Sequence, residues 1–146
     1  MNKILVVTDN QTRYYSIYAM VRRVLDIDNN GTITWKPTMK EAIEEFDKER
    51  FKLQEYDIVI SDREVKGPNG NYHEDGNVNE MVTHIQLLNS DADIAILDGK
   101  EEIVSDQDAA FIQIVIQMIS SQPNGYKKIK LKEEKSIITL NNLKGL

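Results

Sequence analysis

Short apolar runs alternate with segments of helical periodicity along this chain, and this alternation constrains the fold more than any other feature. The runs are short, rich in β-branched residues and bounded by polar residues, which is typical of buried strands. They comprise residues 3–7, 32–35, 57–62 and 93–97. Because a helical segment follows each run, the sequence predicts an α/β fold with a parallel sheet and helices on both faces.

Apolar residues recur at helical spacing in the segments between the predicted strands. These segments are residues 14–25, 38–53, 77–88 and 105–120. The second begins at a capping box in which Thr38 precedes Glu41 by three residues, and the third begins in the same way at Asn77 and Glu80. These signals fix where the helices start.

The length of 146 residues predicts one domain over residues 1–146, without room for a separate effector domain. The absence of Cys excludes disulfides and thiolate catalysis, and it is typical of a protein of the reducing cytoplasm. No apolar run approaches the roughly 20 residues that a membrane helix needs, so we expect no membrane partner.

Charge is unevenly distributed along the chain, whose net charge is -6. Residues 126–146 carry six Lys and two Glu, a net charge of +4, whereas residues 1–125 carry a net charge of -10. An acidic body argues against general binding of nucleic acid. Either the carboxylates form a solvated surface, or some of them gather around a cation.

Three predicted strands end at a carboxylate, at Asp9, Asp62 and Asp98. The carboxyl ends of parallel strands meet at one edge of a sheet, where ligands of open α/β folds bind. Converging carboxylates repel one another unless a cation lies among them, and Mg²⁺ suits oxygen ligands of this kind. The alternative is that each Asp caps the following helix or solvates a loop. The spacing alone leaves both interpretations open.

Several segments resemble the receiver domains of response regulators, in the same order and at similar spacing. The matching segments are residues 3–10 for the first strand, 38–46 for the second helix, 56–62 for the third strand, and 75–97 for the Asp-Gly pair, third helix and fourth strand. The likeness covers about residues 3–98 with one insertion, the loop of residues 63–74.

This resemblance implies a flavodoxin-like, doubly wound sheet of about five strands. It also implies that Asp62 is the phosphoacceptor and that Asp9 and Asp62 can hold Mg²⁺. The family places a Lys on its fifth strand to neutralise the phosphoryl oxygens. Lys130 is the best candidate for that role, with Lys128 second.

The sequence departs from the family at the positions that carry the chemistry. Thr8 stands where receivers have the first of two acids, and the Met-Pro that follows the phosphoacceptor is missing. Asp98 stands where a small hydroxyl residue normally binds the phosphoryl group, and a carboxylate there repels that group. We therefore expect a degenerate, non-enzymatic receiver that needs no cofactor and regulates by binding another protein. The alternative is a Mg²⁺-dependent phosphoacceptor.

The segment of residues 105–120 is apolar nearly all round, so it must be buried on more than one side. We expect this excess to form an interface with a partner protein or a second copy. The residues assigned to it are Phe111, Ile112, Val115, Ile116 and Ile119. The alternative is that the basic tail covers the helix. Residues 136–140 are either a short helix or the return strand of a hairpin from residues 127–132.

Two further motifs suggest metal sites. Residues 26–33 match the first half of a calcium-binding EF-hand loop, but Pro37 replaces the Glu that supplies two oxygens, so we interpret the segment as a turn into a strand. Asp57, Glu64 and Lys66 imitate the arrangement of a metal-dependent nuclease. Because a strand separates Asp57 from Glu64, nuclease activity is a remote alternative.

Overall fold

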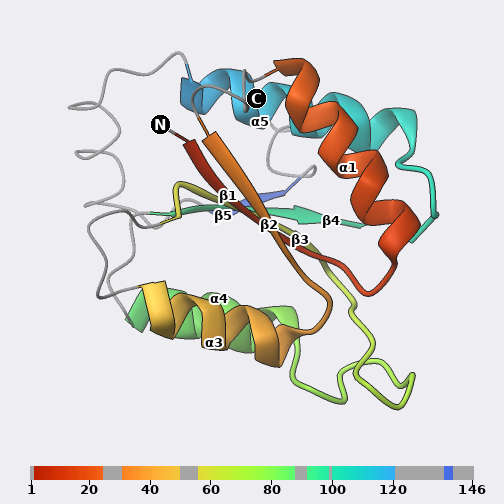
Figure 1. Cartoon of the computed structure of the whole chain (residues 1–146), viewed down its shortest axis with the longest axis vertical. Helices are drawn as coiled ribbons and strands as arrows, with labels where there is room; N and C mark the ends of the chain where they lie inside the picture. The colour runs from red at the N-terminus through yellow and green to blue at the C-terminus, as the bar shows by residue number, and fades with distance from the viewer. Residues whose placement is uncertain are drawn as a thin grey trace.

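A five-stranded parallel sheet forms the centre of the protein, in the strand order β2-β1-β3-β4-β5 (Figure 1). The computed structural model describes residues 2–24, 31–49, 56–87, 92–98, 100–120 and 137–139. The strands are β1 (Asn2–Val7), β2 (Gly31–Lys36), β3 (Ile58–Asp62), β4 (Asp93–Leu97) and β5 (Ile137–Thr139). The parallel α/β architecture that the alternating pattern predicts is confirmed.

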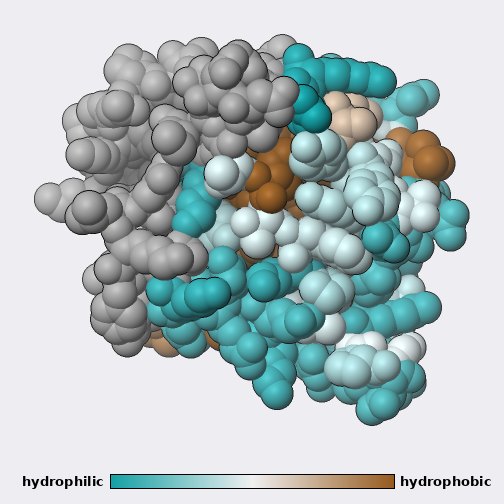
Figure 2. Space-filling model, viewed as in Figure 1, coloured by the Kyte–Doolittle hydropathy of each residue, from teal (hydrophilic) through white to brown (hydrophobic). Residues whose placement is uncertain are grey.

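Among the described residues, helices cover both faces of the sheet, two on each (Figure 1). They are α1 (Gln11–Val24) and α5 (Asp106–Ser120) on one face, and α3 (Met39–Glu49) and α4 (Val78–Leu87) on the other. The outer surface of α3, at the bottom of Figure 2, is hydrophilic, as expected of a helix that buries only one face. Among the described helices, none is both long and apolar enough to span a bilayer.

Successive residues of the strands supply two separate apolar layers, because side chains alternate between the faces of a sheet. Ile4 and Val6 of β1 pack with α1 and α5, whereas Leu5 and Val7 pack with α3 and α4. All five residues of β3 and all five of β4 are buried, which explains why these runs are almost continuously apolar. The central strands therefore form a fixed frame for the residues at their ends.

The fifth strand differs from its prediction. Ile137–Thr139 pairs in parallel with β4, with Ile94 opposite Ile137, so these three residues form a strand and not a helix, and the hairpin predicted with residues 127–132 lies outside the described residues. Their β-branched side chains suit a strand beside the buried β4. Lys128 and Lys130 lie outside the described residues, and Lys130 is not part of the strand described at the fifth position.

The interface predicted on α5 is also wrong for three of its five residues. Phe111, Ile112 and Ile116 are buried in the apolar layer that β1 and α1 share. Helix α5 packs against both α1 and β4, so the fold itself buries apolar residues around much of its circumference. The side chains of Val115 and Ile119 lie outside the part that the structure describes.

Helix α3 begins at the predicted capping box. The Thr38 hydroxyl accepts a hydrogen bond from the Glu41 backbone N–H at 3.1 Å and donates one to the Glu41 carboxylate at 3.1 Å. Thr38→Ala removes both bonds and should lower the free energy of unfolding by about 1 kcal/mol, measured by urea denaturation. Thr83→Ala on the exposed side of α4 is the control, with an expected change within about 0.5 kcal/mol. Equal losses in the two variants would contradict the assigned role of the cap.

Candidate functional site

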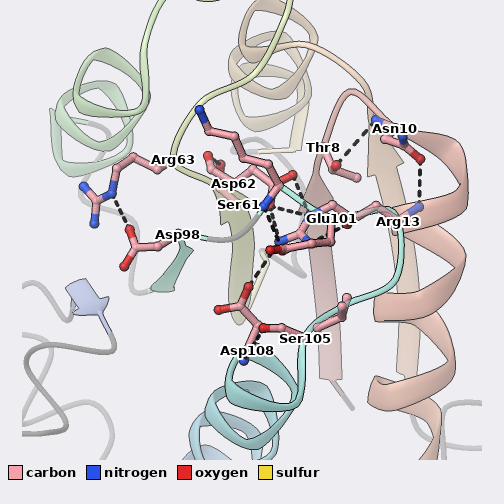
Figure 3. A network of polar contacts seen from close by, with 12 residues as sticks. Thr8, Asn10, Arg13, Ser61, Asp62, Arg63, Asp98, Glu101, Ser105 and Asp108 are labelled. Atoms are coloured by element: carbon pink, nitrogen blue, oxygen red, sulfur yellow. Dashed lines mark hydrogen bonds and ion pairs between the residues drawn. The ribbon is translucent and has the colours of Figure 1, made fainter.

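The three predicted acids lie at the carboxyl edge of the sheet, but they do not form one cluster. Asp62, at the end of β3, is buried with 6% of its surface exposed. Asp9 is exposed, and its carboxylate accepts a hydrogen bond from the Lys66 backbone N–H at 2.7 Å. Asp98 is exposed and forms an ion pair with Arg63, apart from Asp62 (Figure 3). Only Asp62 therefore occupies a buried pocket.

A cation from the chain itself fills that pocket. Arg13, on α1, donates from Nε to both carboxylate oxygens of Asp62 at 2.9 and 3.0 Å, and its Nη2 lies 2.9 Å from Asp62 Oδ1. Nη2 also contacts Asp108 Oδ2 at 3.4 Å, and Nη1 donates to the Glu101 carbonyl at 2.9 Å (Figure 3). Only 1% of the surface of Arg13 is exposed. We call Arg13, Asp62 and Asp108 the buried ion-pair network.

The first turns of two helices position the network. Asn10 caps α1 by accepting a hydrogen bond from the Arg13 backbone N–H at 2.9 Å, which places the guanidinium over the end of β3. Ser105 caps α5 by accepting from the Asp108 backbone N–H at 3.1 Å. A cation in the first turn of a helix opposes the helix dipole, and α1 has no acid there. The negative charges of Asp62 and Asp108 offset the unfavourable interaction of Arg13 with the helix dipole. Through these contacts the network joins α1, β3 and α5.

The pKa values of the pair reflect opposing causes. Burial raises the pKa of the Asp62 carboxyl above its ordinary value, while the hydrogen bonds and charge of Arg13 and the Thr8 hydroxyl oppose that rise. Burial acts to lower the pKa of Arg13, but the hydrogen bonds and charges of Asp62 and Asp108 outweigh it, so the pKa is raised. The guanidinium is thus always charged, and Arg13 is the principal group that favours ionisation of Asp62.

The remaining pocket residues also have specific partners. Thr8 is fully buried, hydrogen-bonds Asp62 and accepts a long hydrogen bond of 3.5 Å from the Asn10 backbone N–H. Asp9 acts on Asp62 through its negative charge, which contributes to the raised pKa of the Asp62 carboxyl. Its bond to Lys66 fastens the loop of residues 63–74 to the end of β1. Of the residues predicted to line the pocket, Thr8 and Asp62 therefore lie together, whereas Asp98 lies apart from them.

The arrangement does not fit the Mg²⁺ site that the receiver resemblance implies. Both oxygens of Asp62 already accept hydrogen bonds from the Arg13 guanidinium, and one oxygen of Asp9 accepts from Lys66. Within the described ranges, no three His, Cys, Asp or Glu residues gather as a group that could hold a metal ion. The cation beside Asp62 is instead the guanidinium of Arg13, on α1.

The nuclease-like motif is not assembled either. Asp57 precedes β3 and accepts a hydrogen bond from the Lys3 backbone N–H at 2.8 Å, at the amino edge of the sheet. Glu64 follows β3 and pairs with Lys100, whose hydrogen bond lowers the pKa of the Glu64 carboxyl. The predicted separation of the two acids is confirmed. Of the EF-hand-like segment, residues 26–30 lie outside the described residues, and Gly31–Lys36 is strand β2.

The sequence patterns did not reveal Arg13, the central residue of the site, or its pairing with Asp108. One local signal was available, because an Arg in the first turn of a helix without a neighbouring acid is unfavourable. Such a residue indicates a carboxylate partner elsewhere in the fold. The identity of that partner, 49 residues further along the chain, cannot be derived from the local pattern.

Comparison with protein-family models, with curated proteins and with solved structures finds no match for this chain.

Proposed function

We propose that this protein is a receiver-like regulatory domain that acts by binding another protein, with Arg13 as the permanent cation of its acidic pocket. The strand order β2-β1-β3-β4-β5 is that of flavodoxin-like folds, which supports the receiver-like scaffold. The position of Asp62 at the end of the central strand β3 supports it further.

One observation carries the non-catalytic part of the proposal: Arg13 engages both oxygens of Asp62. A carboxylate that attacks a phosphoryl group must present a free oxygen in line with the donor. Here the side chain of Asp62 is 8% exposed, and an attack requires the Arg13 contacts to break.

The buried ion-pair network also favours a fixed conformation over a switch. Arg13 connects α1 to the end of β3 and, through Asp108, to α5. A receiver that signals by phosphorylation must shift between two conformations of similar free energy. The contacts of the buried ion-pair network form without a ligand, so they stabilise one of the two conformations. The protein then presents the binding surface of that conformation at all times.

The rival function is a Mg²⁺-dependent phosphoacceptor, favoured by the burial of Asp62 at the carboxyl end of β3 with Asp9 near enough to raise its pKa. In this alternative, Arg13 must leave the pocket before a metal ion and a donor can enter.

Incubation with Mg²⁺ and acetyl phosphate separates the two functions. We expect no mass gain of one phosphoryl group by intact-protein mass spectrometry, because Asp62 is occupied by Arg13. An adduct on the wild-type protein that is lost in Asp62→Asn and retained in the control Asp98→Asn would overturn the non-catalytic assignment.

A further inference from the structure

The loop of residues 63–74 projects away from the carboxyl edge of the sheet (Figure 1). Its base is held in place by Val65, which is buried with 2% of its surface exposed and whose carbonyl accepts a hydrogen bond from the His73 backbone N–H at 3.3 Å. The Lys66 backbone N–H donates to Asp9, which ties the loop to the end of β1. The loop therefore has a defined conformation, although its tip is exposed to solvent.

The carboxylate of Glu74 holds the turn at the tip of this loop. Its two oxygens accept hydrogen bonds from the Asn69 backbone N–H at 3.2 and 2.9 Å, and one of them accepts from the Asn71 side-chain amide at 3.4 Å. A Cβ at Gly67 would lie 2.7 Å from the Glu74 Cβ, so the turn packs closely on this side chain. The Gly70 N–H closes the turn by donating to the Gly67 carbonyl at 3.0 Å.

The pair of Asn69 and Gly70 at this tip has a chemistry of its own. The Gly70 nitrogen can attack the side-chain carbonyl carbon of Asn69: the N–Cγ bond forms, the Cγ–Nδ2 bond breaks, and ammonia leaves with the proton of the nitrogen. Water then opens the resulting succinimide ring at either carbonyl and gives aspartate or isoaspartate. Glycine leaves the attacking nitrogen unshielded, and at Gly70 nothing lies within 4 Å of the position that a Cβ would occupy.

Two hydrogen bonds of the folded loop oppose this attack. The Gly70 N–H must lose its proton and turn toward the Asn69 side chain, but it is bonded to the Gly67 carbonyl. The Asn69 N–H is bonded to Glu74, which holds the peptide on the other side of the same residue. The attack requires the turn to open locally, so its rate follows the population of the open loop.

We propose that Asn69 is a site of spontaneous deamidation, through a succinimide formed with Gly70, and that Glu74 holds this site closed. The product favours the open loop, because a carboxylate replaces a neutral amide on the turn that the Glu74 carboxylate holds, and like charges repel. Isoaspartate also lengthens the backbone of the turn by one methylene group. The modification depends on neither Asp62 nor a partner protein, so it stands or falls separately from the proposed function.

Ageing of the full-length protein at neutral pH, followed by digestion at acidic pH and peptide mapping by mass spectrometry, measures the reaction. Mapping separates Asn69 from the other Asn-Gly pairs of the sequence, at residues 30–31 and 124–125. Glu74→Ala should raise the rate at Asn69 about tenfold, because hydrogen bonds to a charged acceptor shift a local equilibrium by at least about that factor. Glu64→Ala, whose carboxylate bonds outside the turn, should leave the rate unchanged.

Glu74→Gln and a denatured reference complete the test. The rates in the folded proteins should rise in the order wild type, Glu74→Gln, Glu74→Ala, because glutamine keeps one acceptor oxygen without the charge. In guanidinium chloride the three rates at Asn69 should be equal and higher than that of the folded wild type. Equal rates in the folded proteins, a different order, or a wild-type rate that does not rise on denaturation would overturn the inference. A difference between the variants that persists in guanidinium chloride would overturn the closing role of Glu74.

Discussion

Arg13→Met should lower the free energy of unfolding by about 3–5 kcal/mol, the largest effect that we expect of any single substitution. The substitution keeps an unbranched side chain of helical propensity but leaves Asp62 and Asp108 buried without their cation. An uncompensated buried charge costs far more than the loss of an exposed ion pair. Urea denaturation at neutral pH measures the loss.

Arg23→Met, on the exposed surface of α1, is the matched control and should change stability by less than about 0.5 kcal/mol. A second comparison isolates the pair. Arg13→Met combined with Asp62→Leu should be more stable than Arg13→Met alone, because an apolar pair replaces a buried charge that has lost its partner. A loss of less than about 1 kcal/mol in Arg13→Met would mean that the network does not hold the pocket together.

The destabilisation caused by Arg13→Met should grow as the pH rises. In the variant, burial still raises the pKa of Asp62, but the opposing hydrogen bonds and charge of Arg13 are gone. A raised pKa in the folded state means that the folded protein binds more protons than the unfolded chain. The stability that this provides is present below the ordinary Asp pKa of about 3.9 and is lost as the pH rises through the raised value.

Urea midpoints of the wild type and of Arg13→Met, measured between about pH 4 and pH 8, give this dependence directly. The difference between the two proteins should be smallest at the acidic end. Adding Asp62→Asn to Arg13→Met should remove the growth with pH, because the carboxyl that titrates is then absent. A difference that shrinks toward pH 8 would contradict the assigned cause of the Asp62 pKa shift.

The parts of the fold that local patterns determine were predictable from the sequence. Thr38 and Asn77 cap their helices as expected, the latter by accepting a hydrogen bond of 2.9 Å from the Glu80 backbone N–H. Periodicity locates the strands and helices because burial of one face or of both faces imposes a fixed spacing of apolar residues. The position of Asp62 at a strand end follows from the same pattern.

The parts that depend on distant partners were not predictable. An acidic pocket requires a cation, but the pattern does not distinguish a metal ion from a guanidinium on a helix. The apolar circumference of α5 indicates burial on two sides, but it does not reveal that α1 supplies the second side. Strand β5 spans only three residues, too few for periodicity to separate a strand from a helix.

The buried ion-pair network has a consequence for how the chain folds. Arg13 bonds residues 49, 88 and 95 positions away, so its contacts close long loops. The entropy of closing such loops must be offset by neighbouring apolar contacts, so we expect these bonds to form late, after the sheet and its helices have docked. Interactions that form after the folding transition state slow unfolding without accelerating folding. We therefore expect Arg13 to slow unfolding of the native structure more than it accelerates folding.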